Sequence, residues 1–327
     1  MVEPQHILPA AAARPSPRVS VVVPTYNRAR LLPGAIESAL DQTFDDLEVI
    51  VADDGSDDST EQVASAFGDR VQLLKLPHSG KPAAARNAAL GAARGELVAL
   101  LDSDDAWLPE KLERQLELLD RRPEVGLVCT NAWVIDANGR RGDRTYLDGR
   151  AGAEGRVLVP LLDTNFVIAS TVLVRRGLVD EAGGFSEEPL LRAVEDYDLW
   201  LRLAVVTRFA YLPTPLALYR EHAGAIRGTV PRVAVCRSQL RILDRVEPLL
   251  GRHELSARRA LRRRRGALLV GLAQAFEVDG NLTEAGRSWV RAVRARPGPA
   301  AGVLLRRGRE KLRHELLGLR ARLRPQR

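Results

Sequence analysis

Two clusters of carboxylates are the most chemically suggestive feature of this sequence. One spans residues 53–58 (DDGSDD) and the other spans residues 102–105 (DSDD). Neighbouring carboxylates repel one another unless a cation or hydrogen bonds offset the repulsion. Hard divalent cations such as Mg²⁺ and Mn²⁺ prefer oxygen ligands and often bridge to substrate phosphates. The clusters therefore favour metal-assisted chemistry on a phosphate-bearing substrate, with a simple turn or helix cap as the alternative for each.

Each cluster follows an apolar run that predicts a strand, and the run at residues 19–23 is typical of a strand buried on both faces. Four such strands are expected, at residues 19–23, 47–52, 71–76 and 97–101. Segments with apolar residues at helical spacing are found at residues 31–42, 83–93 and 110–120. Strands that alternate with helices predict a mostly parallel α/β sheet. Ligands of such sheets bind beyond the carboxyl ends of the strands, and both clusters fall there.

The segment after the first predicted strand argues against two common classes of nucleotide-binding protein. It has the sequence PTYNR at residues 24–28, with no glycine before Gly34. A dinucleotide-binding fingerprint needs glycines there so that the backbone can approach a pyrophosphate. A G-x-x-x-x-G-K phosphate loop is missing as well. Dehydrogenase and P-loop interpretations are therefore disfavoured.

Six motifs, in order along the chain, resemble those of family 2 glycosyltransferases. They are VSVVVPTYNR (19–28), VADDGSDD (51–58), AARN (84–87), GELVALLDSDDAW (95–107), EDYDLWLRL (195–203) and YREH (219–222). The resemblance covers residues 18–222. It implies the α/β GT-A fold, the Rossmann-like fold of nucleotide-diphospho-sugar transferases with a mostly parallel sheet, followed here by a C-terminal α-helical extension.

The resemblance also implies a role for each matching residue. The residues expected to bind the donor are Pro24, Thr25, Tyr26, Asp53, Asp54, Arg86, Asp102 and Ser103. Asp102 and Asp104 match the D-x-D motif and, with His222, are expected to hold a divalent metal, Mg²⁺ or Mn²⁺. Glu195 and Asp196 match the acidic motif on the acceptor side, where Asp196 is the preferred general base.

Simpler interpretations stay open for several of these residues. Residues 195–198 could form an acidic first turn that complements the dipole of the following helix. His222 could be a surface histidine, Arg86 a solvated side chain, and Tyr26 a packing residue. Arg202 fits an i,i+4 salt bridge as well as a ligand contact, and is left out of the site.

The expected reaction moves a sugar, with inversion, from a nucleotide-diphosphate donor to a hydroxyl of a glycan or lipid-linked acceptor. The Gln-x-x-Arg-Trp motif of processive synthases is missing, so the enzyme is expected to be non-processive and to act in cell-surface polysaccharide or glycoconjugate biosynthesis. One alternative is a sugar-phosphate nucleotidyltransferase, which would usually have a glycine-rich loop after the first strand. The other is a degenerate module that binds nucleotide sugar or glycan without turnover.

Charge divides the chain into an acidic front and a basic back. Up to residue 222, Lys and Arg number 24 against 34 Asp and Glu, whereas the remaining residues hold 25 against 8. The predicted units are a disordered tail (1–17), the GT-A domain (18–225) and a basic helical extension (226–327) with one tetratricopeptide-like hairpin at 266–297. Basic amphipathic helices can lie on anionic membranes, so peripheral membrane contact is expected, with a solvated basic face as the alternative. Nucleic acid is a disfavoured partner, because no base-stacking aromatics interleave with the arginines.

Cysteine usage and hydropathy set the expected location. Cys129 and Cys236 form no C-x-x-C pair, which argues against a disulfide scaffold or a cysteine-ligated zinc site. No apolar run is long enough to span a bilayer, and residues 1–18 lack the apolar core of a signal peptide. The protein is expected in the cytoplasm, with possible peripheral attachment to the inner face of the cell membrane.

Overall fold

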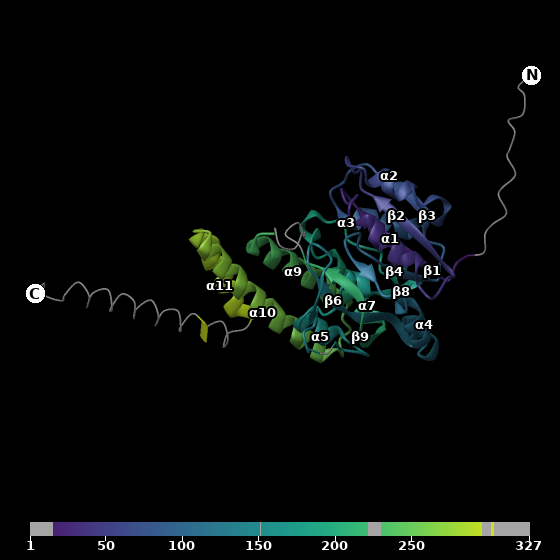
Figure 1. Cartoon of the computed structure of the whole chain (residues 1–327). Helices are drawn as coiled ribbons and strands as arrows, with labels where there is room; N and C mark the ends of the chain where they lie inside the picture. Colours follow the sequence, from purple (N-terminus) through teal and green to yellow (C-terminus); the bar gives the residue numbers. More distant parts are fainter. Residues whose placement is uncertain (1–15, 151, 222–229, 296–301, 304–327) are drawn as a thin grey trace, which may run out of the picture.

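The computed structural model describes residues 16–150, 152–221, 230–295 and 302–303. A curled sheet covered by helices forms the larger part of the molecule, and the last helices extend from it as an arm (Figure 1). The sheet has the strand order β3-β2-β1-β4-β8-β6-β9-β5, and β7 pairs with β6. This architecture confirms the predicted α/β fold class with C-terminal helices.

The first four strands form a parallel ladder. They are β1 (Val19–Thr25), β2 (Leu47–Asp53), β3 (Val71–Lys75) and β4 (Leu97–Leu100). The intervening helices are α1 (Leu32–Leu40), α2 (Thr60–Ser65) and α3 (Pro82–Ala92). Every residue of β1 is buried, as expected for a strand covered on both faces. The four predicted strands are confirmed to within a few residues.

The second half of the sheet departs from a simple alternation of strand and helix. Its strands are β5 (Ala106–Trp107), β6 (Val125–Ile135), β7 (Arg141–Thr145), β8 (Leu173–Arg175) and β9 (Arg208–Arg220). The short β8 lies antiparallel between β4 and β6, so β6 and its parallel neighbour β9 run in the same direction as β1 to β4. The sheet is therefore mostly parallel, with short antiparallel strands at β5, β7 and β8.

The two faces of the sheet pack in two separate hydrophobic cores. Successive strand residues point to opposite faces. Val21 and Val23 lie in one core with Ile36 of α1 and with α4 (Lys111–Arg121), whereas Val22 lies in the other. The second core includes α3, α5 (Leu158–Asp163) and α7 (Glu195–Val206), whose Trp200 is fully buried. The short α6 (Arg176–Glu181) follows β8 directly.

The C-terminal arm consists of α9 (Arg232–Val246), α10 (Leu255–Val278) and α11 (Leu282–Ala295). A turn at residues 279–281, where Gly280 has φ of 75°, joins α10 to α11. Buried residues of the arm, such as Leu243 and Leu268, belong to the same core as Trp200 of α7. No helix in the described part of the chain has the length and apolar character needed to cross a bilayer.

Candidate active site

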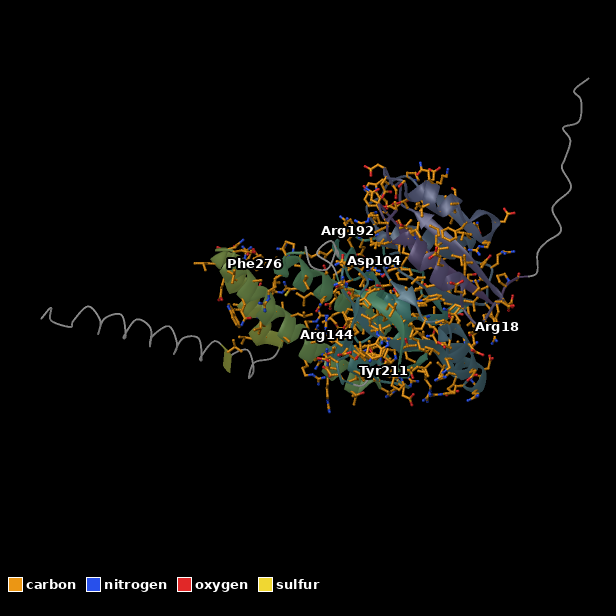
Figure 2. All side chains as sticks on the ribbon, in the orientation of Figure 1. Arg18, Asp104, Arg144, Arg192, Tyr211 and Phe276 are labelled. Atoms are coloured by element: carbon orange, nitrogen blue, oxygen red, sulfur yellow. The ribbon has the colours of Figure 1, made fainter. Side chains whose placement is uncertain are left out.

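A cleft of about 510 Å³ opens at the carboxyl ends of β1, β2 and β4. Its walls are formed by residues 24–28 after β1, Asp54 after β2, residues 102–105 after β4 and the start of α7. Asp104 and Arg192, both labelled in Figure 2, line this cleft. The sheet therefore places both acidic clusters at one edge, where parallel α/β sheets bind ligands.

Tyr26 and His78 form an aromatic surface in the lining of the cleft. Their rings stack with centroids 4.2 Å apart, and Tyr26 remains 39% exposed. The Nδ1 atom of His78 lies 2.8 Å from the Asp54 carbonyl oxygen, which ties the histidine to the end of β2. A flat, partly exposed aromatic pair of this kind is suited to stack against a planar ring.

The two carboxylates at the end of β2 have different partners. Asp54 lines the cleft and accepts hydrogen bonds from the backbone N–H groups of Ser79 and Gly80, each at 2.9 Å. Asp53 is buried and accepts hydrogen bonds from the backbone N–H and the hydroxyl of Ser56. Asp53 therefore shapes the turn, and it is not among the residues that line the cleft.

Arg86 of α3 joins the two halves of the cleft. Its Nη2 donates to Asp102 Oδ1 and its Nη1 donates to Glu195 Oε1, both at 2.6 Å. Its side chain is buried and packs over the Phe185 ring, so it is not the solvated side chain considered as an alternative. Burial lowers the pKa of Arg86, but the charges of Asp102 and Glu195 outweigh it and hold the pKa above its ordinary value.

Glu195 carries a perturbed carboxyl group. Burial raises its pKa to about 7, although the positive charge of Arg86 opposes the shift. Its second oxygen, Oε2, is buried without a hydrogen-bond partner among the described residues. A buried carboxyl that titrates near neutrality, beside a cleft, is typical of a functional position.

The loop at residues 102–105 is fixed by hydrogen bonds from distant segments. The backbone N–H of Asp102 donates to Ser170 Oγ at 3.0 Å, and this hydroxyl donates to Asp105 Oδ2 at 2.6 Å. Arg220 donates its backbone N–H to Asp105 and its Nε to the Asp104 carbonyl, both at 2.8 Å. Burial raises the pKa of Asp105 well above its usual range, and Asp104 and Asp102 add to the shift. The loop is thereby held so that Asp102 and Asp104 line the cleft.

Asp196 lies on the first turn of α7 and also lines the cleft. Two residues later, Asp198 is fully buried and bonds Arg202 Nε at 2.9 Å, which confirms the i,i+4 pair. The same carboxylate bonds Arg245 Nε of α9 at 2.9 Å. The helix that carries Asp196 is therefore anchored to the C-terminal arm through Asp198 and Arg245.

The cleft gathers most of the residues predicted from the sequence. Those that line it are Pro24, Thr25, Tyr26, Asp54, Arg86, Asp102, Ser103, Asp104, Glu195 and Asp196. His222 lies outside the described residues. The structure adds His78, Asp105, Arg192 and Arg220 to the lining. Asp105 and Arg220 stand inside recognised motifs and could have been chosen from the sequence, whereas His78 and Arg192 carry no comparable signal.

Comparisons with known proteins agree with this geometry. The profile of "Glycosyl transferase family 2" matches residues 20–183. The succinoglycan biosynthesis protein ExoO of Rhizobium meliloti is 32% identical over 254 residues, covering 74% of this chain and 69% of that protein. The putative glycosyltransferase EpsE of Bacillus subtilis is 31% identical over 197 residues, covering 57% of this chain and 66% of that protein.

Two solved structures share the fold at lower sequence identity. S. aureus TarS 1–349 in complex with UDP has a TM-score of 0.62 and 20% identity, covering 86% of this chain and 82% of that one. The mannosyltransferase PcManGT from Pyrobaculum calidifontis, in complex with GDP-Man and Mn²⁺, has a TM-score of 0.57 and 21% identity, covering 91% and 81%. With the cleft, the family profile and the sequence relatives in agreement, the chain belongs to glycosyl transferase family 2 and is a glycosyltransferase of the GT-A fold.

Proposed function

We propose that this glycosyltransferase moves a sugar from a nucleotide-diphosphate donor to a hydroxyl group of a glycan or lipid-linked acceptor. We further propose that transfer is non-processive, metal-assisted and inverting. The observation that carries this proposal is the meeting of Asp102 and Asp104 with Asp196 in one cleft beside the Tyr26–His78 stack. Leaving-group stabilisation and a base are the two chemical requirements of such a transfer, and this cleft has side chains for both.

The nucleoside would occupy the part of the cleft lined by Tyr26, His78 and Asp54. The exposed face of the aromatic pair would stack against the base, and Asp54 holds the loop that contains His78. The solved relatives bind UDP, UDP-GlcNAc and GDP-Man, so the fold accommodates both pyrimidine and purine nucleotides. These complexes support the donor class.

The donor set at residues 102–105 fits a divalent cation that also binds phosphate oxygens. Among the described residues, no group of three His, Cys, Asp or Glu side chains could hold a metal by itself. Mg²⁺ and Mn²⁺ need no such cage, because one or two carboxylates suffice when substrate phosphates and water complete the shell. Asp102 and Asp104 would hold the cation, which would offset the charge that develops on the departing diphosphate.

Asp196 would act as the general base. As the acceptor oxygen bonds to the anomeric carbon, the bond from that carbon to the diphosphate oxygen breaks, and Asp196 takes the hydroxyl proton. A single displacement with one base inverts the anomeric centre. Glu195 would be a positioning residue, because it binds Arg86, and Arg86 also binds Asp102.

The setting of the reaction is also part of the proposal. The name of ExoO supports a role in polysaccharide biosynthesis. Val278, Leu282 and Val290 are exposed apolar residues on the arm, and Arg287 and Arg291 flank Val290; these residues support peripheral contact with an anionic membrane. The acceptor would then be presented at the cytoplasmic face of that membrane.

Calorimetric titration of the full chain with UDP-, GDP- and dTDP-sugars, with and without Mn²⁺, tests the proposal. Binding of at least one nucleotide sugar that strengthens with Mn²⁺ is the expected result. The Asp104→Asn variant should lose the metal-dependent part of the affinity, while Asp180→Asn on α6, at a residue that does not line the cleft, serves as the matched control. Folded protein that binds none of these donors would contradict the proposed donor class.

A further inference from the structure

A second, shallower depression lies on the C-terminal arm and shares no lining residue with the active-site cleft. Its volume is about 360 Å³, and its floor includes the buried residues Leu240, Leu272 and Phe276. Four arginines line it, Arg237 and Arg241 from α9 and Arg287 and Arg291 from α11. We call this depression the arginine groove; Figure 2 labels Phe276 there, on the arm and apart from Asp104.

The acidic residues at the arginine groove are already engaged in ion pairs. Asp244 pairs with Arg265, and Glu284 pairs with Arg287, each at 2.5 Å. Arg241 pairs with Glu188 at 2.8 Å, outside the groove lining. These pairs neutralise Arg241 and Arg287. The positive charge that remains in the groove comes from its other two arginines.

Arg237 and Arg291 are the two arginines of the groove left without a carboxylate partner among the described residues. The Arg237 guanidinium carbon lies 5.3 Å from the centroid of the Phe276 ring, which holds this cation against the floor of the groove. The planar guanidinium fork matches phosphate oxygens and can bind them through two parallel hydrogen bonds. Two such forks, from different helices, suit one phosphate or diphosphate group.

A short helical turn, η3 (Pro189–Leu191), connects the groove to the cleft. Leu190 lines the groove, while Arg192, two residues later, lines the cleft, as Asp196 does. The Ser238 hydroxyl of α9 donates to the Leu190 carbonyl, which fixes η3 against the arm. Arg192 is a third arginine without an ion-pair partner among the described residues. An acceptor that extends from the cleft across η3 would therefore meet, on both sides of this turn, arginines that have no ion-pair partner among the described residues.

From this arrangement we propose that the arginine groove binds a phosphate or diphosphate group of the acceptor, so that the acceptor substrate is a phosphate-bearing glycan or glycolipid. The inference rests on the proposed function, because it assigns the groove to the acceptor of the same transfer. A lipid-linked diphosphate and a phosphate within a soluble glycan present the same chemistry to Arg237 and Arg291.

Binding of inorganic pyrophosphate to the full chain, measured by calorimetry in EDTA, tests this site directly. EDTA removes the divalent cation that the cleft is proposed to use for phosphate, so the groove should give the main binding signal. Arg237→Ala and Arg291→Ala should each weaken binding about tenfold, since each removes charge-assisted hydrogen bonds. Arg287→Ala is the matched control, because this groove arginine is already paired, and it should change the affinity less than about twofold.

Two results would overturn the proposal. One is wild-type affinity for pyrophosphate in the Arg237→Ala/Arg291→Ala double variant, and the other is an equal loss in Arg287→Ala, which would indicate diffuse charge alone. Binding of nucleotide sugar and Mn²⁺ by the same variants should match the wild type, which shows that they are folded. A wild-type chain that binds no donor but binds pyrophosphate through Arg237 would contradict the proposed function and leave the groove assignment intact.

Vesicles distinguish the two sources of the phosphate. Phosphatidylcholine vesicles with and without phosphatidic acid are sedimented with the wild type and the double variant. Vesicle binding that requires phosphatidic acid and also requires Arg237 and Arg291 would assign the groove to a lipid phosphate. Loss of pyrophosphate binding without any effect on vesicles would assign it to a phosphate within a soluble glycan.

Discussion

Asp196 lies at the cleft on the first turn of α7, in the position expected for a base that approaches the acceptor. Asp196→Asn keeps the shape of the side chain and removes its basicity, so kcat should fall by about 10²- to 10⁴-fold. Donor affinity should stay within about twofold of wild type. Nucleoside diphosphate release and donor titration measure the two quantities, with Asp180→Asn as the control. A loss of donor affinity equal to the loss of kcat would place Asp196 in the donor site instead.

The raised pKa of Glu195 leads us to expect that the stability of the protein depends on pH. Burial raises its folded pKa to about 7 from the model-peptide value of 4.5, so the folded state binds the proton more tightly than the unfolded state. The stability that this tighter proton binding contributes is fully present below the pKa of Glu195 in the unfolded state. It is lost as the pH rises through the pKa of Glu195 in the folded state. Relative to Glu195→Gln, the unfolding free energy of the wild type should fall with a slope of up to about 1.4 kcal/mol per pH unit in that window.

Denaturant unfolding at several pH values between about 5 and about 8 measures the difference in unfolding free energy between the two proteins. The other titrating groups, including Asp105, are present in both proteins and largely cancel in the comparison. Curves for wild type and Glu195→Gln that stay parallel across the window would show that Glu195 ionises normally in the folded protein.

At the scale of elements, an ion pair between α9 and α7 supports the catalytic helix. Arg245 of α9 bonds the fully buried carboxylate of Asp198 and also Glu188, at 2.9 and 2.7 Å. Arg245→Met should lower the unfolding free energy by about 2 kcal/mol, because Asp198 keeps Arg202 but loses its second cation. It should also lower kcat, because Asp196 stands on the same turn of α7.

Arg241→Met is the matched control for this link. Arg241 lies one turn earlier on α9 and pairs with Glu188, yet it does not contact Asp198. Its loss should cost less than about 1 kcal/mol of unfolding free energy, and it should lower kcat less than Arg245→Met does. Equal effects of the two substitutions on kcat would show that α9 acts on α7 through surface charge rather than through Asp198.

The parallel strands β1 to β4 were largely predictable, because each is a run of mostly apolar residues that predicts a strand by itself. The antiparallel β8 was not predictable, since three residues carry too little pattern and their place depends on β4 and β6. Within the site, Asp53 and Asp54 are chemically identical neighbours, and only the local turn decides that Asp54 lines the cleft. The Arg86–Glu195 bond joins residues 109 positions apart, which no local periodicity encodes.

At the scale of the whole molecule, charge and packing divide the chain differently. The acidic front and basic back suggest a boundary near residue 225, yet Leu243 of α9 and Trp200 of α7 lie in one continuous core. Elements that share a core lose their buried surface together, so they tend to unfold in one cooperative step. The arm and the catalytic sheet should therefore behave as a single folding unit.

Calorimetric unfolding of the full chain should show one transition, with calorimetric and van't Hoff enthalpies that agree. Leu243→Ala removes a side chain that is 1% exposed where the arm meets the catalytic core, and it should destabilise that whole transition by about 3 kcal/mol. Val290→Ala, at a position 52% exposed on α11, should shift it by less than about 0.5 kcal/mol. A separate low-temperature transition, moved by Leu243→Ala while the main one stays in place, would show instead that the arm unfolds alone. In that case the anchoring of α7 by Arg245 could not persist once the arm had melted, and activity should then be lost at the lower transition.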